Sequence, residues 1–144
     1  MRKSTLPFIA ISALVALSNC SKQGGEPAAA PEAEQAAPFI KDVDVAAAAE
    51  LIEESDPPTV LDVRTPEEFA AGHIEGAINV DFKDPGFKDT LGKLDTDKSY
   101  LIHCHSGGRS GSSKPIFSEL GFKAIYHLDG GMLAWEEAGL PTVK

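Results

Sequence analysis

The chain has little cysteine, few basic residues and no long apolar run, and each shortage excludes a class of protein. Its 144 residues include two cysteines, Cys20 and Cys104, so a scaffold stapled by several disulfides is excluded. Lysine and arginine total 13 against 22 aspartates and glutamates, which gives a formal net charge of −9. A protein that binds DNA or RNA along its backbone needs a basic footprint, so we expect no nucleic-acid partner.

The longest uncharged apolar segment, Leu6 to Leu17, follows Arg2 and Lys3 and has 12 residues. A helix that spans a bilayer needs about 20 apolar residues. The segment is therefore too short for a permanent membrane span. A basic start followed by a short apolar stretch is the order found in a secretory signal peptide.

The signal region ends in Leu17-Ser18-Asn19-Cys20, which resembles the bacterial lipobox. In that motif the cysteine is lipidated and becomes the first residue of the mature chain, so the resemblance predicts a lipoprotein-type signal peptide over residues 1–19 and lipidation at Cys20. Asn19 departs from the usual small residue. The alternative is an ordinary secretory signal in which Cys20 is incidental.

Residues 20–38 join the expected lipidated cysteine to the rest of the chain. Ser21 to Pro38 is made of Ala, Pro, Gly, Glu, Gln, Ser and Lys and has no large apolar residue to bury. Such a composition is typical of a flexible tether, and 18 such residues have a root-mean-square span of about 24 Å. We expect a protein of the periplasm or cell envelope, attached to a bacterial membrane only through its lipid anchor.

The remaining 106 residues, 39–144, have the size of a single domain. Short apolar runs alternate there with helical patterns, which predicts an α/β fold with a parallel sheet. The runs expected to form strands are Thr59 to Val63, Ala77 to Val80, Tyr100 to His103 and Ala124 to His127.

Two helix starts can be read from capping residues. Asp44 is a plausible N-cap for a helix over residues 45–54. Thr65-Pro66-Glu67-Glu68 is a capping box with proline at the first helical position, so a short helix is expected to begin at Pro66 and to end at Gly72.

Two further helices are expected in the C-terminal third. Gly131 to Ala138 can form a last helix, in which Leu133 and Trp135 are predicted to be core residues. Pro115 cannot donate to a helical ladder. The helix before Gly121 is therefore expected either to start late, with Ser113 near its N-cap, or to be kinked.

The segment Leu101 to Ser110, LIHCHSGGRS, contains the main candidate site. An apolar strand ends at Cys104, and a Gly-containing turn leads to Arg109. Successive amides in such a turn can point at one anion, and both the turn and a following helix N-terminus favour thiolate over thiol. Arg109 is suited to bind an oxyanion. No Asp or Glu occurs from Lys98 to Ser118, so we expect an anion site with no acidic residue nearby in the sequence.

Three sequence blocks together resemble the rhodanese family of thiosulfate sulfurtransferases. They are LDVRTPEEFAAGHIEGAINV (Leu61 to Val80), HCHSGGRS (His103 to Ser110) and LDGGMLAW (Leu128 to Trp135). The resemblance covers residues 39–144 and implies a single rhodanese domain, with a parallel five-stranded sheet flanked by helices.

The resemblance also implies a reaction. Cys104 would take the outer sulfur of a small anionic donor such as thiosulfate, and a thiol or cyanide would remove it from the resulting persulfide; a protein acceptor is also possible. Arg109 would hold the donor's sulfonate, and no metal or organic cofactor is required. The backbone cradle would be formed by His105, Ser106, Gly107, Gly108 and Arg109.

Several alternatives stay open. Cys104 and Arg109 are spaced C-x4-R, whereas phosphate-ester chemistry on the same kind of loop uses C-x5-R, so a phosphatase or arsenate reductase is disfavoured. A non-catalytic persulfide carrier or protein-interaction module is the runner-up. Arg64 is expected to pair with Asp62, and a role in donor binding is the alternative. Metal binding by Cys104 with its two flanking histidines is disfavoured.

Overall fold

The computed structural model describes residues 38–144. The expected signal peptide, the lipidation site Cys20 and the tether up to residue 37 lie outside the described residues. Within residues 38–144, no helix has the length and apolar character needed to cross a bilayer.

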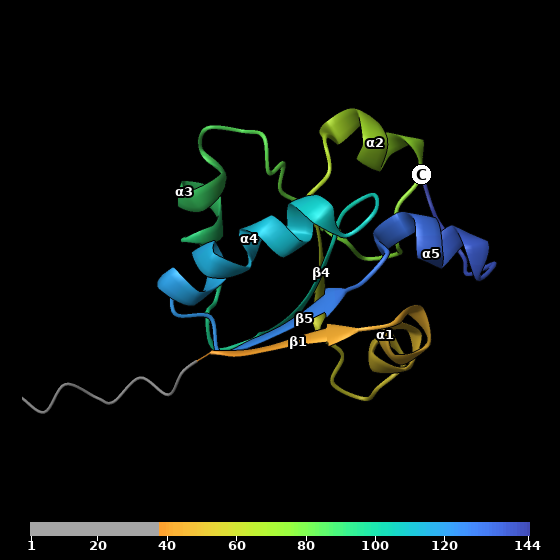
Figure 1. The fold of residues 1–144 in the computed structure, drawn as a ribbon, viewed down its shortest axis with the longest axis horizontal. Helices are drawn as coiled ribbons and strands as arrows, with labels where there is room; N and C mark the ends of the chain where they lie inside the picture. Colours follow the sequence, from red (N-terminus) through yellow and green to blue (C-terminus); the bar gives the residue numbers. More distant parts are fainter. Residues whose placement is uncertain (1–37) are drawn as a thin grey trace, which may run out of the picture. The chain divides into compact units, whose positions relative to one another are not determined.

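Five parallel strands form one twisted sheet in the order β1-β5-β4-β2-β3 (Figure 1). Because all strands run the same way, the segments that follow them meet at one edge of the sheet, where ligands of α/β proteins bind. The strands are β1 (Phe39–Val43), β2 (Thr59–Asp62), β3 (Ile78–Asn79), β4 (Ser99–His103) and β5 (Ala124–Leu128).

Helices cover both faces of this sheet. The helices α1 and α5 pack on one face and α3 and α4 on the other, while α2 follows β2 at its carboxyl end (Figure 1). Their bounds are α1 (Val45–Ile52), α2 (Pro66–Ala71), α3 (Phe87–Leu91), α4 (Gly108–Glu119) and α5 (Gly131–Glu137).

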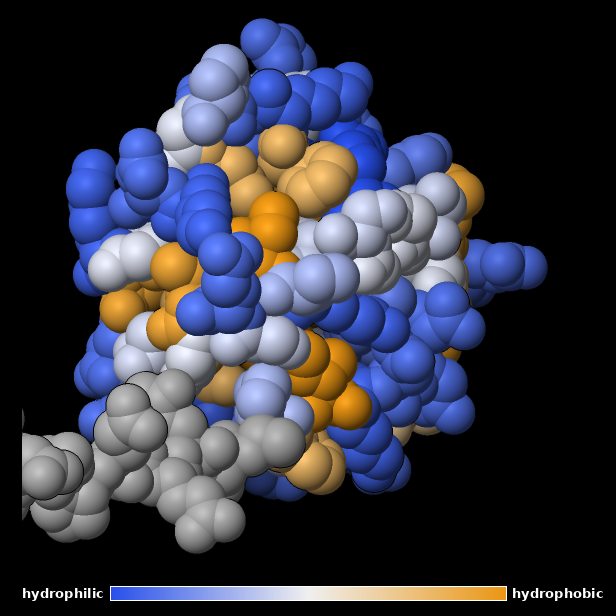
Figure 2. Space-filling model, turned by 60° about the vertical axis from the view of Figure 1, so that its left-hand side comes forward, coloured by the Kyte–Doolittle hydropathy of each residue, from blue (hydrophilic) through white to orange (hydrophobic). Residues whose placement is uncertain are grey.

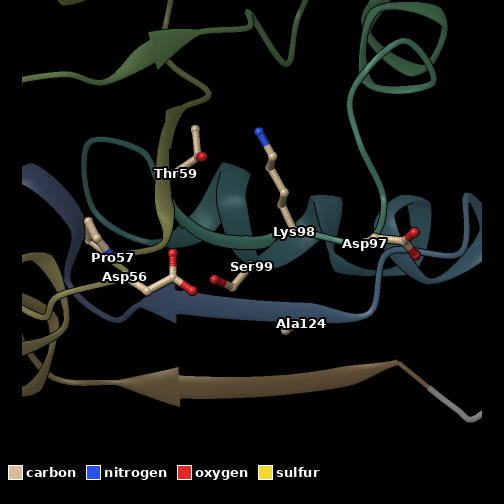
Figure 3. Close-up of a pocket in the computed structure, with 7 residues that line it drawn as sticks. All are labelled: Asp56, Pro57, Thr59, Asp97, Lys98, Ser99 and Ala124. Atoms are coloured by element: carbon tan, nitrogen blue, oxygen red, sulfur yellow. The ribbon is translucent and has the colours of Figure 1, made fainter.

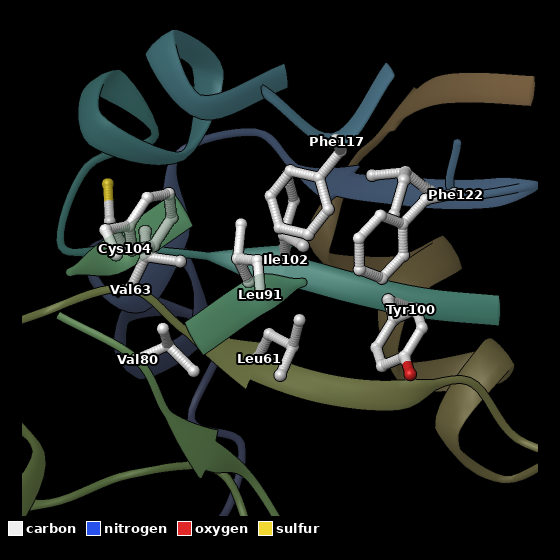
Figure 4. Packing of buried hydrophobic residues seen from close by; sticks show 11 residues of the cluster. Leu61, Val63, Val80, Leu91, Tyr100, Ile102, Cys104, Phe117 and Phe122 are labelled. Atoms are coloured by element: carbon white, nitrogen blue, oxygen red, sulfur yellow. The ribbon is translucent and has the colours of Figure 1, made fainter. Parts of the chain in front are cut away.

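Side chains alternate between two hydrophobic cores along each strand. In β4, Tyr100 and Ile102 join the core beneath α3 and α4, and Leu101 joins the core beneath α1 and α5. Figure 4 shows the first core, which is centred on aromatic rings in edge-to-face contact, among them Phe117 and Phe122 with centroids 5.0 Å apart. Cys104 continues the alternation and lies on the α4 side.

Capping residues predicted the helix starts correctly. Asp44 accepts a hydrogen bond from the Ala47 amide at 2.9 Å and begins α1. The capping box between Thr65 and Glu68 is formed at the start of α2, which ends at Gly72. The residues themselves did not predict β1, whose sequence FIKDV contains two charged residues and is mostly exposed, because an edge strand needs only a few inward-facing apolar residues.

The prediction that Leu133 is a core residue is wrong: it is 48% exposed, whereas Trp135 is buried as expected. Leu133 lies on the outer side of α5. The other large exposed apolar residues of the described domain, residues 38–144, are Phe39 and Ile78, which belong to the two edge strands. Figure 2 shows one face of the domain, on which hydrophilic side chains separate small apolar patches.

The helix after the cysteine loop does not start late. It begins at Gly108 and continues through Pro115, so the expectation of an N-cap near Ser113 is wrong. Proline removes only the amide that would bond the Gly111 carbonyl, four residues back. Two residues before the proline, the Ser113 hydroxyl donates to the Ser110 carbonyl at 2.7 Å. The first turn of α4 is therefore in place beside Cys104.

Candidate active site

Cys104 follows the carboxyl end of β4, in the centre of the sheet edge where the parallel strands end. It is a free cysteine and only 1% exposed. In Figure 4 its sulfur points toward the loop before α4 and away from the apolar side chains below it. Cys104 therefore lies at the border between the core beneath α4 and the loop, with its sulfur on the loop side.

The loop between Cys104 and α4 surrounds the sulfur with hydrogen-bond donors. Burial raises the pKa of the Cys104 thiol, but hydrogen bonds from the Ser110 hydroxyl and from the amides of Ser110, Ser106 and Arg109 outweigh it, so the pKa lies below its ordinary value. Gly107 has a φ of 88°, in the left-handed region that favours glycine, and this lets the chain turn directly into α4. The thiolate is thereby favoured over the thiol.

The N-terminus of α5 holds this loop from the other side. The amides of Met132 and Leu133 donate to the carbonyls of Cys104 and His105, both at 2.9 Å. Such a close approach requires glycine at position 131, because a Cβ there would lie 2.4 Å from the Cys104 carbonyl oxygen. Gly131 of the third sequence block is thus explained by contact with the cysteine loop, whereas a Cβ at Gly130 would lie 2.8 Å from the Ala134 side chain of α5 itself.

Arg109, the expected donor-binding residue, forms a bidentate ion pair with Glu68 of α2. Its two terminal nitrogens lie 2.7 Å from the two carboxylate oxygens. The Arg109 side chain beside it lowers the pKa of Glu68 to about 2, and Glu68 raises the pKa of Arg109. The loop has no acidic neighbour in the sequence, but the fold brings Glu68 to Arg109 from a distant part of the chain.

Arg64 pairs with Asp62, as the sequence predicted. The two side chains lie 2.6 Å apart, and Arg64 also donates to the Gly72 carbonyl at 2.7 Å. Arg64 is 5% exposed and braces the end of β2 against the end of α2. Its participation in donor binding stays a prediction.

The two histidines that flank Cys104 lie in different environments. His103 is fully buried, and burial lowers its pKa, whereas His105 is exposed at the surface of the loop. Ser106 and Gly108 are also exposed, and Gly107 is buried. Within residues 38–144, no three His, Cys, Asp or Glu side chains gather in a way that could hold a metal ion.

Three residues that the sequence analysis did not select for the site extend from the sulfur to the surface. The Ser110 hydroxyl lies 3.5 Å from Cys104 Sγ and 2.9 Å from His127 Nε2, and His127 Nδ1 lies 2.7 Å from an oxygen of Asp42. Asp42 and His127 are partners in the register of β1 and β5. Sequence reasoning could have found this contact only from the pairing of β1 with β5, whose register places Asp42 beside His127.

A separate hollow lies at the amino ends of the parallel strands, at the opposite end of the strands from Cys104 (Figure 3). Its lining includes Thr59, Ser99 and Ala124, which are the first residues of β2, β4 and β5. Cys104 follows the last residue of β4, so this hollow lies at the other end of the strand and is not part of the cysteine site.

Comparisons with known proteins agree with this architecture. Residues 44–138, more than half of the chain, match the Rhodanese-like domain family. Thiosulfate sulfurtransferase 16, chloroplastic, of Arabidopsis thaliana is 38% identical over 92 residues, which cover 57% of this chain and 77% of that protein. Thiosulfate sulfurtransferase GlpE of Pseudomonas aeruginosa is 36% identical over 76 residues, which cover 53% of this chain and 67% of that protein.

A solved structure extends the similarity to the fold. The crystal structure of a rhodanese-related protein from Thermoplasma volcanium has a TM-score of 0.64 and 33% sequence identity, and it covers 72% of this chain and 97% of that one. Sequence, fold and the cysteine loop lead to the same assignment, and the chain belongs to the rhodanese family, a family of the sulfurtransferase type.

Proposed function

We propose that the chain is an exported sulfurtransferase that moves a sulfane sulfur from thiosulfate, or a similar small anion, to a thiophilic acceptor. The observation that carries this proposal is the buried Cys104 sulfur, which faces amides of its own loop and has a lowered pKa. A low-pKa cysteine in such a cradle is a nucleophile and not a packing residue.

In the proposed reaction, the Cys104 thiolate attacks the outer sulfur of thiosulfate. The bond between the two donor sulfurs breaks, and sulfite leaves with the bonding electron pair. The persulfide anion that forms is held by the same amides, those of Ser106, Arg109 and Ser110, that favour the thiolate. An acceptor such as cyanide or a thiol then takes the outer sulfur and regenerates the Cys104 thiolate.

Arg109 supports the choice of an anionic donor. Glu68 binds its two terminal nitrogens and fixes the guanidinium, and His105 and Gly108 on the same turn are exposed. A donor with a sulfonate end can be held there by charge-assisted hydrogen bonds. No cofactor is needed for this transfer, because thiosulfate supplies both the sulfur and the leaving group.

The test is mass spectrometry of the purified full chain after incubation with thiosulfate. We expect the peptide that contains Cys104 to gain the mass of one sulfur atom and to lose it on addition of cyanide. The variant Cys104→Ser should gain nothing, since the hydroxyl is too weakly acidic for the cradle to ionise it. Turnover of thiosulfate and cyanide by Cys104→Ser at the wild-type rate would refute the assignment.

Turnover separates the enzyme from its runner-up. If Cys104 is loaded with sulfur but thiocyanate is not released catalytically, the chain is a persulfide carrier. Pro115 does not argue for the non-catalytic module, because α4 begins at Gly108, well before the proline, and its first turn lies beside Cys104.

Export and lipidation belong to this proposal as well. They rest on the N-terminal sequence: a short apolar segment after Arg2 and Lys3, a lipobox-like ending at Cys20 and a polar tether before the domain. We propose that the domain acts in the periplasm or cell envelope, where its acceptor is a thiol, cyanide or a protein.

A further inference from the structure

We propose that His127 is a positioning residue that accepts the Cys104 thiol proton through the Ser110 hydroxyl, and that Asp42 holds His127 for this task. This inference rests on the proposed function only for its effect on sulfur transfer. The state of the thiol itself can be measured without any sulfur donor.

Three short contacts join the four residues. Cys104 Sγ and Ser110 Oγ lie 3.5 Å apart, Ser110 Oγ and His127 Nε2 lie 2.9 Å apart, and His127 Nδ1 and Asp42 Oδ1 lie 2.7 Å apart. The fold brings the four residues together from β1, β5, α4 and the end of β4. On β1 and β5, Asp42 and His127 are paired in register on the sheet face that α4 covers.

The contact with Asp42 fixes the orientation of the imidazole proton. An ionised carboxylate only accepts hydrogen bonds, so Nδ1 must carry a proton. Hydrogen bonds from Lys114 and His127 lower the pKa of Asp42, which keeps it ionised. The other ring nitrogen, Nε2, is therefore free to accept a proton from Ser110.

The single proton of the Ser110 hydroxyl has three possible acceptors. They are Cys104 Sγ, His127 Nε2 and the Gly107 carbonyl, which lies 3.2 Å from the hydroxyl. With His127 neutral, the hydroxyl donates to Nε2 and cannot stabilise a thiolate. With His127 protonated, the proton on Nε2 is donated to Ser110 or to the Gly107 carbonyl, also 3.2 Å away, and the hydroxyl can donate to the sulfur.

The proposed transfer balances without any further reactant. The S–H bond of Cys104 breaks and its proton binds Ser110 Oγ, while the original O–H bond of Ser110 breaks and its proton binds His127 Nε2. Ser110 stays neutral, and the result is a thiolate and an imidazolium joined by one hydroxyl. Nothing is oxidised or reduced.

Burial favours this coupling between the two groups. Ser110 is fully buried, Cys104 is 1% exposed and His127 is 5% exposed, so their charges interact through a medium of lower dielectric constant than water. The other charged groups near the imidazole are Asp42, with Lys114 of α4 bound to it, and Asp129, which follows β5 and lies close to Gly107. Asp42 and Lys114 reach solvent.

The test is the pH dependence of Cys104 alkylation by iodoacetamide, followed on the Cys104 peptide of the full chain by mass spectrometry. Only the thiolate reacts, so the rate reports the thiol's apparent pKa. We expect His127→Gln to raise that pKa by about one unit, which lowers the rate roughly tenfold at any pH below it. Asp42→Asn, at an exposed position, should shift it in the same direction by less.

A double-variant comparison distinguishes the relay from a general effect on packing. Ser110→Ala should raise the apparent pKa at least as much as His127→Gln, and adding His127→Gln to Ser110→Ala should cause no further shift, because the connection is already broken. His73→Gln is the matched control: its Nδ1 bonds the Phe69 carbonyl and its ring stacks on Phe69, so the profile should not move.

Each outcome has a distinct meaning. An unchanged alkylation profile in folded His127→Gln and Asp42→Asn overturns the relay, as does an additive effect of His127→Gln and Ser110→Ala. If the profile shifts as expected but thiosulfate never loads Cys104, the relay stands and the proposed sulfurtransferase function fails. If His127→Gln does not fold, the Asp42→Asn and Ser110→Ala profiles decide the question.

Discussion

The Cys104 sulfur has to satisfy two opposing requirements, burial and ionisation. In the proposed reaction Cys104 must be buried enough to exclude water from the persulfide, yet burial alone would keep the thiol protonated. The loop resolves this by directing three amides and one hydroxyl at the sulfur, and the net pKa falls below its ordinary value. Residue identity alone would not achieve this, because each donor is placed by the turn at Gly107 and the start of α4.

The pair between Arg109 and Glu68 should make stability depend on pH in a defined range. The pKa of Glu68 falls from 4.5 to about 2 in the folded chain, so the ionised pair contributes stability above pH 4.5 and loses it as the pH falls from 4.5 toward 2. Glu68→Gln should lower the free energy of unfolding at pH 7 by about 1 kcal/mol at most, since both groups are partly exposed. Urea unfolding at pH 7 and pH 3 measures this.

The variant Glu68→Gln separates the ion pair from the helix cap. Glutamine keeps one oxygen for the capping-box hydrogen bond to the Thr65 amide, so the substitution removes the charge and one of the two acceptors of Arg109 while the helix cap remains. Glu67→Gln removes an equal charge from an exposed position on the same helix and is the control. An equal loss of stability in both variants, or a loss from Glu68→Gln that persists unchanged at pH 3, would contradict the role of the pair.

The docking of α5 on the cysteine loop depends on Gly131. Gly131→Ala places a Cβ 2.4 Å from the Cys104 carbonyl oxygen at a φ of 57°, so the helix N-terminus must move away from the loop. We expect a loss of about 1–3 kcal/mol in the free energy of unfolding and slower loading of Cys104 by thiosulfate. Urea unfolding and the mass-spectrometric loading assay measure the two effects.

Gly139 provides the comparison for this variant. Its φ is 71°, but a Cβ there would meet nothing within 4 Å, so Gly139→Ala carries the backbone strain without the close contact. Gly139→Ala should lose less stability and load sulfur at the wild-type rate. If both glycine variants behave alike, the approach of α5 to the loop is not what fixes the loop.

Loop length should matter as much as loop composition. Inserting one glycine between Gly107 and Gly108 converts C-x4-R to C-x5-R and keeps every side chain, but it separates the turn from the first residue of α4. The amides of Arg109 and Ser110 would then miss the sulfur. A displacement of about 1 Å at a reacting centre can cost on the order of 100-fold in rate, so thiosulfate:cyanide transfer should fall by at least that factor. Unchanged kinetics in a folded insertion variant would reopen the phosphatase interpretation.

The parts of the fold that the sequence predicted are those with local signals. Asp44 and Thr65 cap their helices through neighbouring amides, and the apolar runs of the central strands are continuous because both sheet faces are buried. The relay was not predicted, because Asp42 and His127 are 85 positions apart and meet only through the register of β1 with β5. Glu68 was likewise brought to Arg109 by tertiary structure.

Attachment of the whole molecule to a membrane should depend on Cys20, which lies outside the folded domain. If Cys20 is lipidated, the chain has an anchor, a tether of about 24 Å and an acidic domain that anionic lipid repels, so nothing else should hold it to a bilayer. We expect the wild-type chain in the membrane fraction of its host and Cys20→Ala in the soluble fraction or unprocessed. Cys104→Ala is the matched control: it removes the other cysteine and should stay with the membrane. Wild-type protein found wholly in the soluble fraction of the cell envelope would show that the N-terminus is an ordinary secretory signal, and in that case substitution of Cys20 should leave both fractionation and sulfur transfer unchanged.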